Sequence, residues 1–279
     1  MSRSDSNSGK KPSGRQGGGY RKKSFARGNA PVKKPIPHTG DGPRLVRLNK
    51  YIAHAGICSR READTLIAAG NITVNGKTIT EMGYKVSPAD EVRFDGRLLN
   101  TEKKEYVLLN KPKNFITTTR DEKGRRTVME LVSRASPSRL LPVGRLDRNT
   151  TGLLLFTNDG DLAKKLTHPK HGVRKIYHVE LDKTFRDADL QKVREGLQLE
   201  DGPISVDEIS YIKGAPKKEV GVEIHSGRNR IVRRIFEHLG YRVVRLDRVV
   251  FAGLTKKDLP RGHWRHLTRQ EVINLRMIS

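Results

Sequence analysis

Residues 144–160 read GRLDRNTTGLLLFTNDG, a stretch that predicts a reactive loop followed by a buried strand. The apolar run Leu153–Phe156 has the length of a strand in a protein core, and turn-forming residues bound it on both sides. The carboxylate of Asp147 should therefore lie on a loop that leads directly into the core. Arg145 and Arg148 flank Asp147 and should keep it ionised, which suits a nucleophile or a base. A structural Asp–Arg pair on the surface is an equally good interpretation of this stretch alone.

The composition favours a polyanionic partner. The 279-residue chain contains 56 Lys and Arg against 31 Asp and Glu, for a formal net charge of +25. We expect nucleic acid rather than a membrane, because no apolar run approaches about 18 residues and neither a signal peptide nor a lipidation motif is evident. The single cysteine, Cys58, excludes a disulfide framework and a cysteine-rich zinc site, and a reducing cytoplasm is the simplest compartment.

Three segments are expected along the chain. Residues 1–43 are rich in Gly, Ser, Lys and Arg and lack apolar periodicity, which predicts a disordered basic tail. This tail is either a nonspecific RNA tether or a solubilising extension. Residues 44–100 and 105–279 each contain enough patterned apolar sequence for a folded domain, and a charged linker separates them.

Residues 44–100 predict a small unit of two helices and a few strands. Ser59 and Glu62 form a capping box for the second helix, and Asn75-Gly76 indicates a β-hairpin. Free amides at the start of that helix, together with nearby cations, favour an anion such as RNA phosphate. A merely solvated basic face is the alternative. The predicted RNA contacts are Arg47, Lys50, Arg60, Arg61 and Lys77.

Two later stretches complete the pattern. Residues 174–181, RKIYHVEL, alternate as a strand, and Tyr177 falls on its apolar face, where it is either core or functional. Residues 226–241, SGRNRIVRRIFEHLGY, predict an amphipathic helix with Asn229 as its N-cap. The first turn of this helix carries Arg228, Arg230, Arg233 and Arg234. The helix dipole opposes cations there, which suggests an anionic partner, either RNA phosphate or a carboxylate such as that of Asp147.

Metal and nucleotide motifs are not evident. The histidine pairs at 168 and 171 and at 263 and 266 lack the carboxylates or cysteines that would complete a metal site. No glycine-rich loop has the spacing of a P-loop or of a dinucleotide-binding turn. We therefore predict neither a metal nor a cofactor.

The motifs carry a resemblance to known families. Residues 47–79, RLNKYIAHAGICSRREADTLIAAGNITVNGKTI, resemble the S4 RNA-binding domain. The three stretches at 144–160, 174–181 and 226–241 together resemble RNA pseudouridine synthases. With an S4 domain in front, the chain is similar to the RsuA/RluB-type branch, which modifies uridines of ribosomal RNA. Where many members have Met, this chain has Ile235, a mild change at a packing position.

The resemblance implies roles for individual residues. Asp147 matches the catalytic aspartate, Tyr177 the tyrosine that packs against the target base, and Arg233 the arginine that pairs with the aspartate. Val232 matches an apolar residue of the same pocket. The implied reaction breaks the N1–C1′ bond of a uridine and rejoins the base through C5, without a redox step. Whether the aspartate attacks covalently or removes a sugar proton stays open.

The target base must leave its stack to reach such a pocket, so base flipping is expected. An aromatic ring offers the base a stacking face, and arginines can hold the flanking phosphates. The predicted contacts of this kind are Arg145, Arg148, Arg228 and Arg230.

We expect an α+β protein: a small S4 domain followed by a mixed, mainly antiparallel sheet with a catalytic cleft across it. By analogy alone, large-subunit (23S) rRNA is the favoured substrate, and a monomer is expected. The alternative function is a non-catalytic S4-domain factor for ribosome assembly. The triplet Asp147, Tyr177 and Arg233 argues against it, because a binding module has no use for all three.

Overall fold

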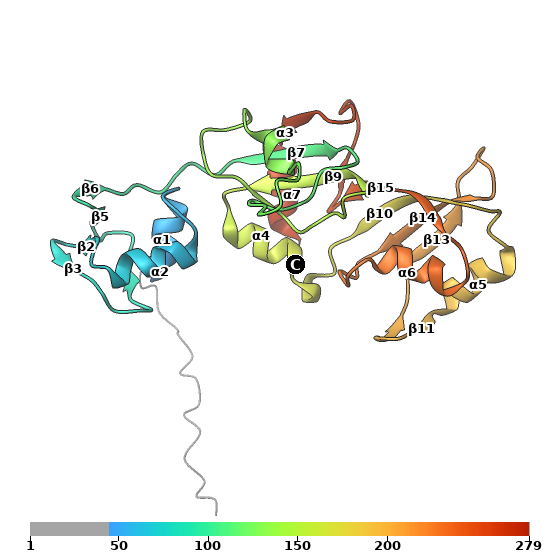
Figure 1. The fold of residues 1–279 in the computed structure, drawn as a ribbon, viewed down its shortest axis with the longest axis horizontal. Coiled ribbons are helices and arrows are strands. Elements are labelled where there is room, and N and C mark those ends of the chain that lie inside the picture. Colours follow the sequence, from blue (N-terminus) through green and yellow to red (C-terminus); the bar gives the residue numbers. More distant parts are fainter. Residues whose placement is uncertain (1–44, 279) are drawn as a thin grey trace, which may run out of the picture. The chain divides into compact units, whose positions relative to one another are not determined.

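The computed structural model describes residues 45–278 (Figure 1). The basic tail predicted for residues 1–43 lies outside this range. Residues 45–99 form two helices, α1 (Leu48–His54) and α2 (Arg60–Ala68), and short strands. A four-stranded sheet has the order β3 (Lys77–Thr78), β2 (Ile72–Val74), β5 (Val92–Phe94) and β6 (Arg97–Leu98). A separate pair joins β1 (Val46–Arg47) and β4 (Lys85–Val86).

The local signals in this part of the chain are confirmed. Ser59 and Glu62 form the capping box at the start of α2, with bonds of 3.2 and 2.7 Å. Asn75 and Gly76 both have positive φ, at 50° and 79°, as a two-residue hairpin turn between β2 and β3 requires. One apolar core, which includes Leu48, Ile52 and Ile67, lies under the helices.

A nine-stranded mixed sheet organises the rest of the described chain. Its main path is β13 (Glu208–Tyr211), β14 (Glu219–Ile224), β10 (Lys175–Leu181), β15 (Val243–Phe251), β9 (Thr151–Thr157), β7 (Tyr106–Lys111) and β17 (Trp264–His266). The short strands β8 (Leu141–Pro142) and β16 (Leu254–Thr255) pair with β9 and β15. Within this sheet β15 and β9 are parallel and the other pairs are antiparallel, so the predicted mixed, mainly antiparallel sheet is confirmed.

Helices cover both faces of this sheet (Figure 1). They are α3 (Val128–Val132), α4 (Gly160–Thr167), a 3₁₀ turn (Pro169–His171), α5 (Asp187–Glu195), α6 (Ile231–His238) and α7 (Arg269–Met277). A small hairpin of β11 (Leu197–Leu199) and β12 (Gly202–Ile204) follows α5.

The centre of strand β9, Leu153 to Phe156, is apolar because both faces of the strand are buried. Leu153 and Leu155 pack in the core that includes α4 and α7, whereas Leu154 and Phe156 pack in the core that includes α3. All four are fully buried, and each contributes about 1.5–3 kcal/mol of apolar burial. The strand predicted from the run at 153–156 is therefore confirmed, and it fixes the loop before it rigidly to the core.

Gly152 marks the place where β9 meets β15. Its φ is +104°, and a Cβ atom built there would lie 2.2 Å from the carbonyl oxygen of Arg248. The parallel pairing of the two strands consists of Asp247 with Thr151 and Arg248 with Gly152. A side chain at 152 would force the strands apart directly after the Asp147 loop.

We expect Gly152→Ala to lower the free energy of unfolding by about 3 kcal/mol, because a strained φ and a backbone clash coincide there. Urea-induced unfolding measures the effect. Gly221→Ala on β14 is the matched control, since its new Cβ would meet nothing nearer than 3.9 Å, and it should change stability by less than about 0.5 kcal/mol. Equal stability of the two variants would contradict the interpretation.

Candidate active site

The loop that carries Asp147 is anchored by one buried lysine. Lys111 ends β7 and is completely buried. Its Nζ donates to three backbone carbonyls of the loop, those of Asp147 (3.1 Å), Arg148 (3.3 Å) and Thr150 (2.8 Å). Burial lowers the pKa of Lys111 to about 8, although the charge of Asp147 opposes the change. One ammonium group therefore ties the loop to the end of β7.

The segment after β7 holds the loop at two further points. Thr117 Oγ1 donates to the carbonyl of Leu146 at 2.8 Å and accepts from its amide at 3.2 Å. The amide of Asn114 donates to the carbonyl of Arg148 at 2.9 Å. The backbone on both sides of Asp147 is thus fixed by hydrogen bonds, which limits how far its carboxylate can move.

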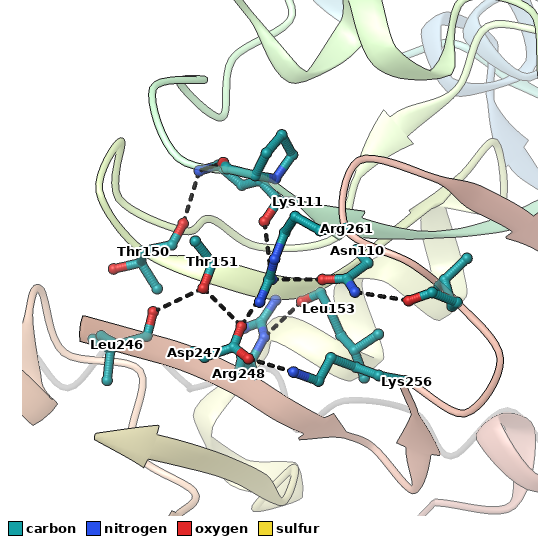
Figure 2. Close-up of polar contacts among 12 residues, drawn as sticks. Asn110, Lys111, Thr150, Thr151, Leu153, Leu246, Asp247, Arg248, Lys256 and Arg261 are labelled. Carbon is teal, nitrogen blue, oxygen red and sulfur yellow. Dashed lines mark hydrogen bonds and ion pairs between the residues drawn. The ribbon is translucent and has the colours of Figure 1, made fainter. Parts of the chain in front are cut away.

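A polar network on β15 supports Lys111 in turn (Figure 2). Asp247 accepts from Thr151 Oγ1 at 2.7 Å and from Arg261 Nη1 at 2.9 Å, and it is also paired with Lys256. Burial would raise the pKa of Asp247, but these donors overcome burial and lower it to about 2. Arg261 Nη1 also approaches the carbonyl of Lys111 at 3.4 Å. The network joins β15, the start of β9 and the end of β7.

The carboxylate of Asp147 is partly exposed and lies near two arginines from the α6 segment. Its Oδ2 is 3.8 Å from Arg230 Nη1 and 3.9 Å from Arg233 Nε. Among the ion pairs of residues 45–278, none joins Asp147 to Arg145 or Arg148, whose side chains are exposed. The flanking arginines are therefore not the ion-pair partners of the carboxylate, and the cations come from a distant segment that includes Arg233, the partner implied by the family resemblance.

Helix α6 starts later than the sequence suggested. Arg230, with a left-handed φ of 48°, occupies the N-cap position in place of the predicted Asn229. Arg233 is buried in the first turn, and its Nη1 donates to the carbonyl of Val243 at 3.1 Å. Burial lowers the pKa of Arg233, and the charge of Arg230 adds to this while Asp147 opposes it. A hydrogen bond to β15 thus orients this guanidinium toward the carboxylate.

A cavity of about 190 Å³ opens beside Asp147. A cavity of about 150 Å³ accepts a benzene ring, so this volume suffices for one pyrimidine base. Of the residues predicted from sequence, its wall contains Asp147, Tyr177, Val232, Arg145, Arg228 and Arg230. Arg148 is exposed on the loop outside this wall, and Arg233 reaches Asp147 without contributing to the wall.

Several residues of the site were missed by the sequence analysis. Lys111, Thr150, Lys175 and Arg248 are polar residues within or beside apolar strands, a pattern that could have marked them. Lys175 Nζ donates to the carbonyl of His225 at 2.6 Å, at the segment that leads into α6. Burial lowers the pKa of Lys175 to about 8, and the nearby charge of Arg248 acts in the same direction.

The lowered pKa of Lys175 predicts a pH dependence of RNA affinity. Its proton is lost as the pH rises through about 8, well below the ordinary lysine value, and RNA favours the charged form. We expect affinity to fall roughly threefold between pH 7 and pH 9 from this group, as for the loss of one hydrogen bond. Fluorescence anisotropy at constant ionic strength measures it. Lys175→Arg stays charged and should lack this fall; an identical fall in both proteins would exclude Lys175 as the cause.

The RNA contacts predicted in the first domain lie on three elements. Arg47 is exposed directly before α1, Lys50 is half-buried on α1, and Lys77 is exposed on β3. Arg60 and Arg61 are exposed in the first turn of α2. The capping box occupies the amides of Ser59 and Glu62 but not those of Arg60 and Arg61, so both amides and basic side chains can attract an anion there.

Two kinds of feature are missing from residues 45–278. Within this range no group of three or more His, Cys, Asp and Glu side chains is arranged to hold a metal ion. In the same residues no helix has both the length and the apolar character needed to cross a membrane.

Comparisons with known proteins agree on one family. The RNA pseudouridylate synthase model matches residues 105–238, and the S4 domain model matches residues 46–92. Ribosomal large subunit pseudouridine synthase B of Bacillus subtilis is 41% identical over 238 residues, which cover 84% of this chain and 97% of that protein. The protein of the same name from Haemophilus influenzae is 39% identical over 257 residues, which cover 88% of this chain and 72% of that protein.

A solved structure described as a pseudouridylate synthase has a TM-score of 0.60 and 30% identity to this chain. The match covers 82% of this chain and 99% of the solved chain. The chain therefore belongs to the RNA pseudouridine synthase family and is an isomerase of RNA uridine with an S4 domain. The α+β fold and the family resemblance inferred from sequence are both confirmed.

Proposed function

We propose that the protein converts one specific uridine of 23S ribosomal RNA to pseudouridine, with Asp147 as the catalytic carboxylate. The names of the relatives from Bacillus subtilis and Haemophilus influenzae, which refer to the large ribosomal subunit, support this substrate. The net charge of +25 suits a large polyanion. The substrate is either free 23S rRNA or an assembly intermediate of the large subunit.

One observation carries the proposal: Asp147, the distant arginines of the α6 segment and Tyr177 meet at one base-sized cavity. The buried guanidinium of Arg233 places a positive charge 3.9 Å from the carboxylate, in a site from which a substrate would exclude water. An aromatic ring in the same wall offers a stacking surface for a flipped base. These are the groups that a glycosidic isomerisation needs, and none of them requires a metal.

In the proposed reaction the target uridine enters the cavity and its base packs against Tyr177. Asp147 acts on the sugar while the N1–C1′ bond breaks, and the base then turns and bonds to C1′ through C5. Val232 supplies an apolar wall that excludes water from the cleaved intermediate. Arg233 holds the carboxylate in position. Phosphates on either side of the target are contacts for Arg145, Arg148, Arg228 and Arg230.

We further propose that residues 44–100 act as an RNA-binding domain and residues 105–279 as the catalytic domain. The matches of the two family models to residues 46–92 and 105–238 are in keeping with this division. In the first domain the proposed RNA contacts are Arg47, Lys50, Arg60, Arg61 and Lys77. These residues bind RNA phosphates electrostatically, and this binding does not depend on the nucleotide sequence.

Replacing Arg60 and Arg61 by Gln should lower the slope of log affinity against log salt by roughly one for each lost phosphate contact. Arg97→Gln is the matched control, because Arg97 is an exposed arginine of the same domain outside the proposed contact set. Filter binding at four salt concentrations gives the slopes. A double variant whose slope equals that of the wild type would remove Arg60 and Arg61 from the RNA interface.

We propose that the protein acts as a monomer in the cytoplasm. The large exposed apolar side chains of residues 45–278 are scattered over separate elements, as on Ile57, Leu98, Val244 and Met277, which is typical of a monomer surface. Light scattering after gel filtration tests the oligomeric state, and a dimer mass would contradict the proposal.

The function is tested with unmodified 16S and 23S transcripts and with particles that lack the modification. Each is incubated with wild-type protein or with Asp147→Asn, and pseudouridine is mapped by carbodiimide adducts and primer extension. A single wild-type-specific stop in 23S rRNA is expected. A stop in 16S rRNA would contradict the proposed subunit. No stop in any substrate, despite tight binding, would overturn the proposed activity.

A further inference from the structure

Arg248 is a buried arginine in the wall of the catalytic cavity. It lies on β15, is only 3% exposed and contributes to the cavity wall together with Tyr177. In the antiparallel pairing of β10 and β15 it is directly opposite Tyr177. Side chains of directly paired residues leave the sheet on the same face, so its guanidinium accompanies the tyrosine ring.

The contacts of Arg248 leave part of its guanidinium without a partner. Nε donates to the carbonyl of Leu153 at 2.8 Å (Figure 2), and Cζ lies 4.5 Å from the ring centroid of Phe251, which also lines the cavity. Nη2 is buried and has no hydrogen-bond partner. A buried donor without an acceptor costs about 1–3 kcal/mol, so native proteins rarely retain one without a use for it.

Other unpartnered polar atoms gather at the same place. Residues 45–278 contain five buried side-chain nitrogen or oxygen atoms without a partner. Arg248 Nη2 and Thr150 Oγ1 belong to residues of the cavity wall, and Arg233 Nε lies 3.9 Å from Asp147 Oδ2. This concentration indicates a site whose hydrogen bonds are completed by a ligand.

The charge of Arg248 is not neutralised by a carboxylate. Its neighbour Asp247 projects to the opposite face of β15, where Lys256 and Arg261 pair with it. No ion pair of residues 45–278 includes Arg248. The missing partner is therefore an acceptor that carries, or develops, negative charge.

The burial of Arg248 decides which acceptors of RNA it can reach, the backbone phosphates or the carbonyl oxygens of a base. Backbone phosphates can be met by Arg145, Arg228 and Arg230, which are all exposed. Arg248 is covered, so only a group inserted into the cavity reaches it. The inserted group is the flipped base, whose acceptors are the carbonyl oxygens O2 and O4.

We infer that Arg248 donates a hydrogen bond from Nη2 to a carbonyl oxygen of the flipped uracil and stabilises the charge that the base acquires during the reaction. This inference rests on the proposed function. When the N1–C1′ bond breaks, its electron pair remains on the base and spreads over N1, O2 and O4. After the base turns, a pair from C5 forms the new bond to C1′. The C5 proton is then released and N1 takes up a proton, so that atoms and charge balance.

The test combines substitution of Arg248 with substitution of single atoms of the substrate. Wild type, Arg248→Gln and Arg248→Lys are compared on three RNAs that carry uridine, 2-thiouridine or 4-thiouridine at the target position. Sulfur accepts hydrogen bonds more weakly than oxygen. Single-turnover rates and RNA affinities are measured, and circular dichroism reports whether each variant is folded.

We expect Arg248→Gln to lower the single-turnover rate on uridine RNA about 10²–10³-fold, as for removal of a donor to a developing anion, with RNA affinity unchanged. One of the two thio substitutions should slow the wild type about tenfold and leave Arg248→Gln unaffected, which defines a coupling between residue and atom. Arg248→Lys keeps the charge and should retain more activity than Arg248→Gln. If Arg248→Gln is unfolded, the effects of the thio substitutions on Arg248→Lys are compared with those on the wild type instead.

Two failures are distinguishable. If the wild type modifies no ribosomal uridine, the proposed function fails. If the wild type is active but both thio substitutions slow wild type and folded variants by the same factor, Arg248 only supports the fold at Leu153 and the inference is overturned.

Discussion

Asp147→Asn will abolish turnover, with a loss of at least about 10⁴-fold in the single-turnover rate, as is typical when the central group of a catalytic unit is removed. The amide is nearly isosteric but can neither attack as an anion nor accept a proton at pH 7. The fold should be unaffected, because the side chain of Asp147 is partly exposed and the amide oxygen of Asn can still face the two arginines that lie 3.8 and 3.9 Å from the carboxylate.

RNA affinity of Asp147→Asn should equal or slightly exceed that of the wild type, because the substitution removes a negative charge from a cationic cavity. Asp258→Asn is the matched control: Asp258 is exposed in a turn after β16, with a φ of 55° that Asn tolerates. This control should retain full activity and affinity. Measurable turnover by Asp147→Asn would refute the proposed mechanism, and loss of binding would show that the carboxylate serves the fold.

Lys111→Met should lower kcat at least about 100-fold while leaving KM nearly unchanged. The ammonium holds three carbonyls of the catalytic loop at 2.8–3.3 Å, and a shift of about 1 Å in a catalytic group costs this much in rate. The free energy of unfolding should fall by about 3 kcal/mol, because buried carbonyls lose a charged donor. Lys111 is thus a positioning residue.

Lys113→Met tests whether the effect is specific to the buried lysine. Lys113 is two residues further along and exposed, so its substitution should change stability by less than about 0.5 kcal/mol and leave kcat unaltered. Steady-state kinetics and urea unfolding are measured for both variants. A destabilised Lys111→Met with the wild-type kcat would show that Lys111 supports the fold without positioning Asp147.

Several elements could be predicted because adjacent residues define them. The apolar run at 153–156 became β9, Asn75-Gly76 became a hairpin turn, and Ser59 with Glu62 became a capping box. In each case the deciding interaction joins residues within a few positions of one another, or depends on the alternation of a single strand. Such features can be predicted without knowledge of the tertiary structure.

The start of α6 was predicted one residue too early because tertiary contacts decide it. Asn229 is a good N-cap by type, yet Arg230 takes that position in a left-handed conformation. Such a backbone costs about 1–3 kcal/mol for a residue other than glycine. The ion pairs of Arg230 with Asp147 and Glu237 help to offset that strain. Tertiary contacts of Arg230, rather than the N-cap preference of Asn229, therefore set the first residue of the helix.

By itself the sequence determined the family, the α+β class and the three stretches that meet at the site, because these depend on local motifs and their order. Only the tertiary structure decided that Arg230 joins Arg233, the partner that the family resemblance implied, beside Asp147, and that Arg145 and Arg148 form no ion pair with it. It also decided that Lys111 and Arg248 are buried beside the loop. Periodicity assigns side chains to the faces of a strand, but the neighbours of that strand follow from long-range pairing, here β10 with β15 and β15 with β9, which no local pattern contains.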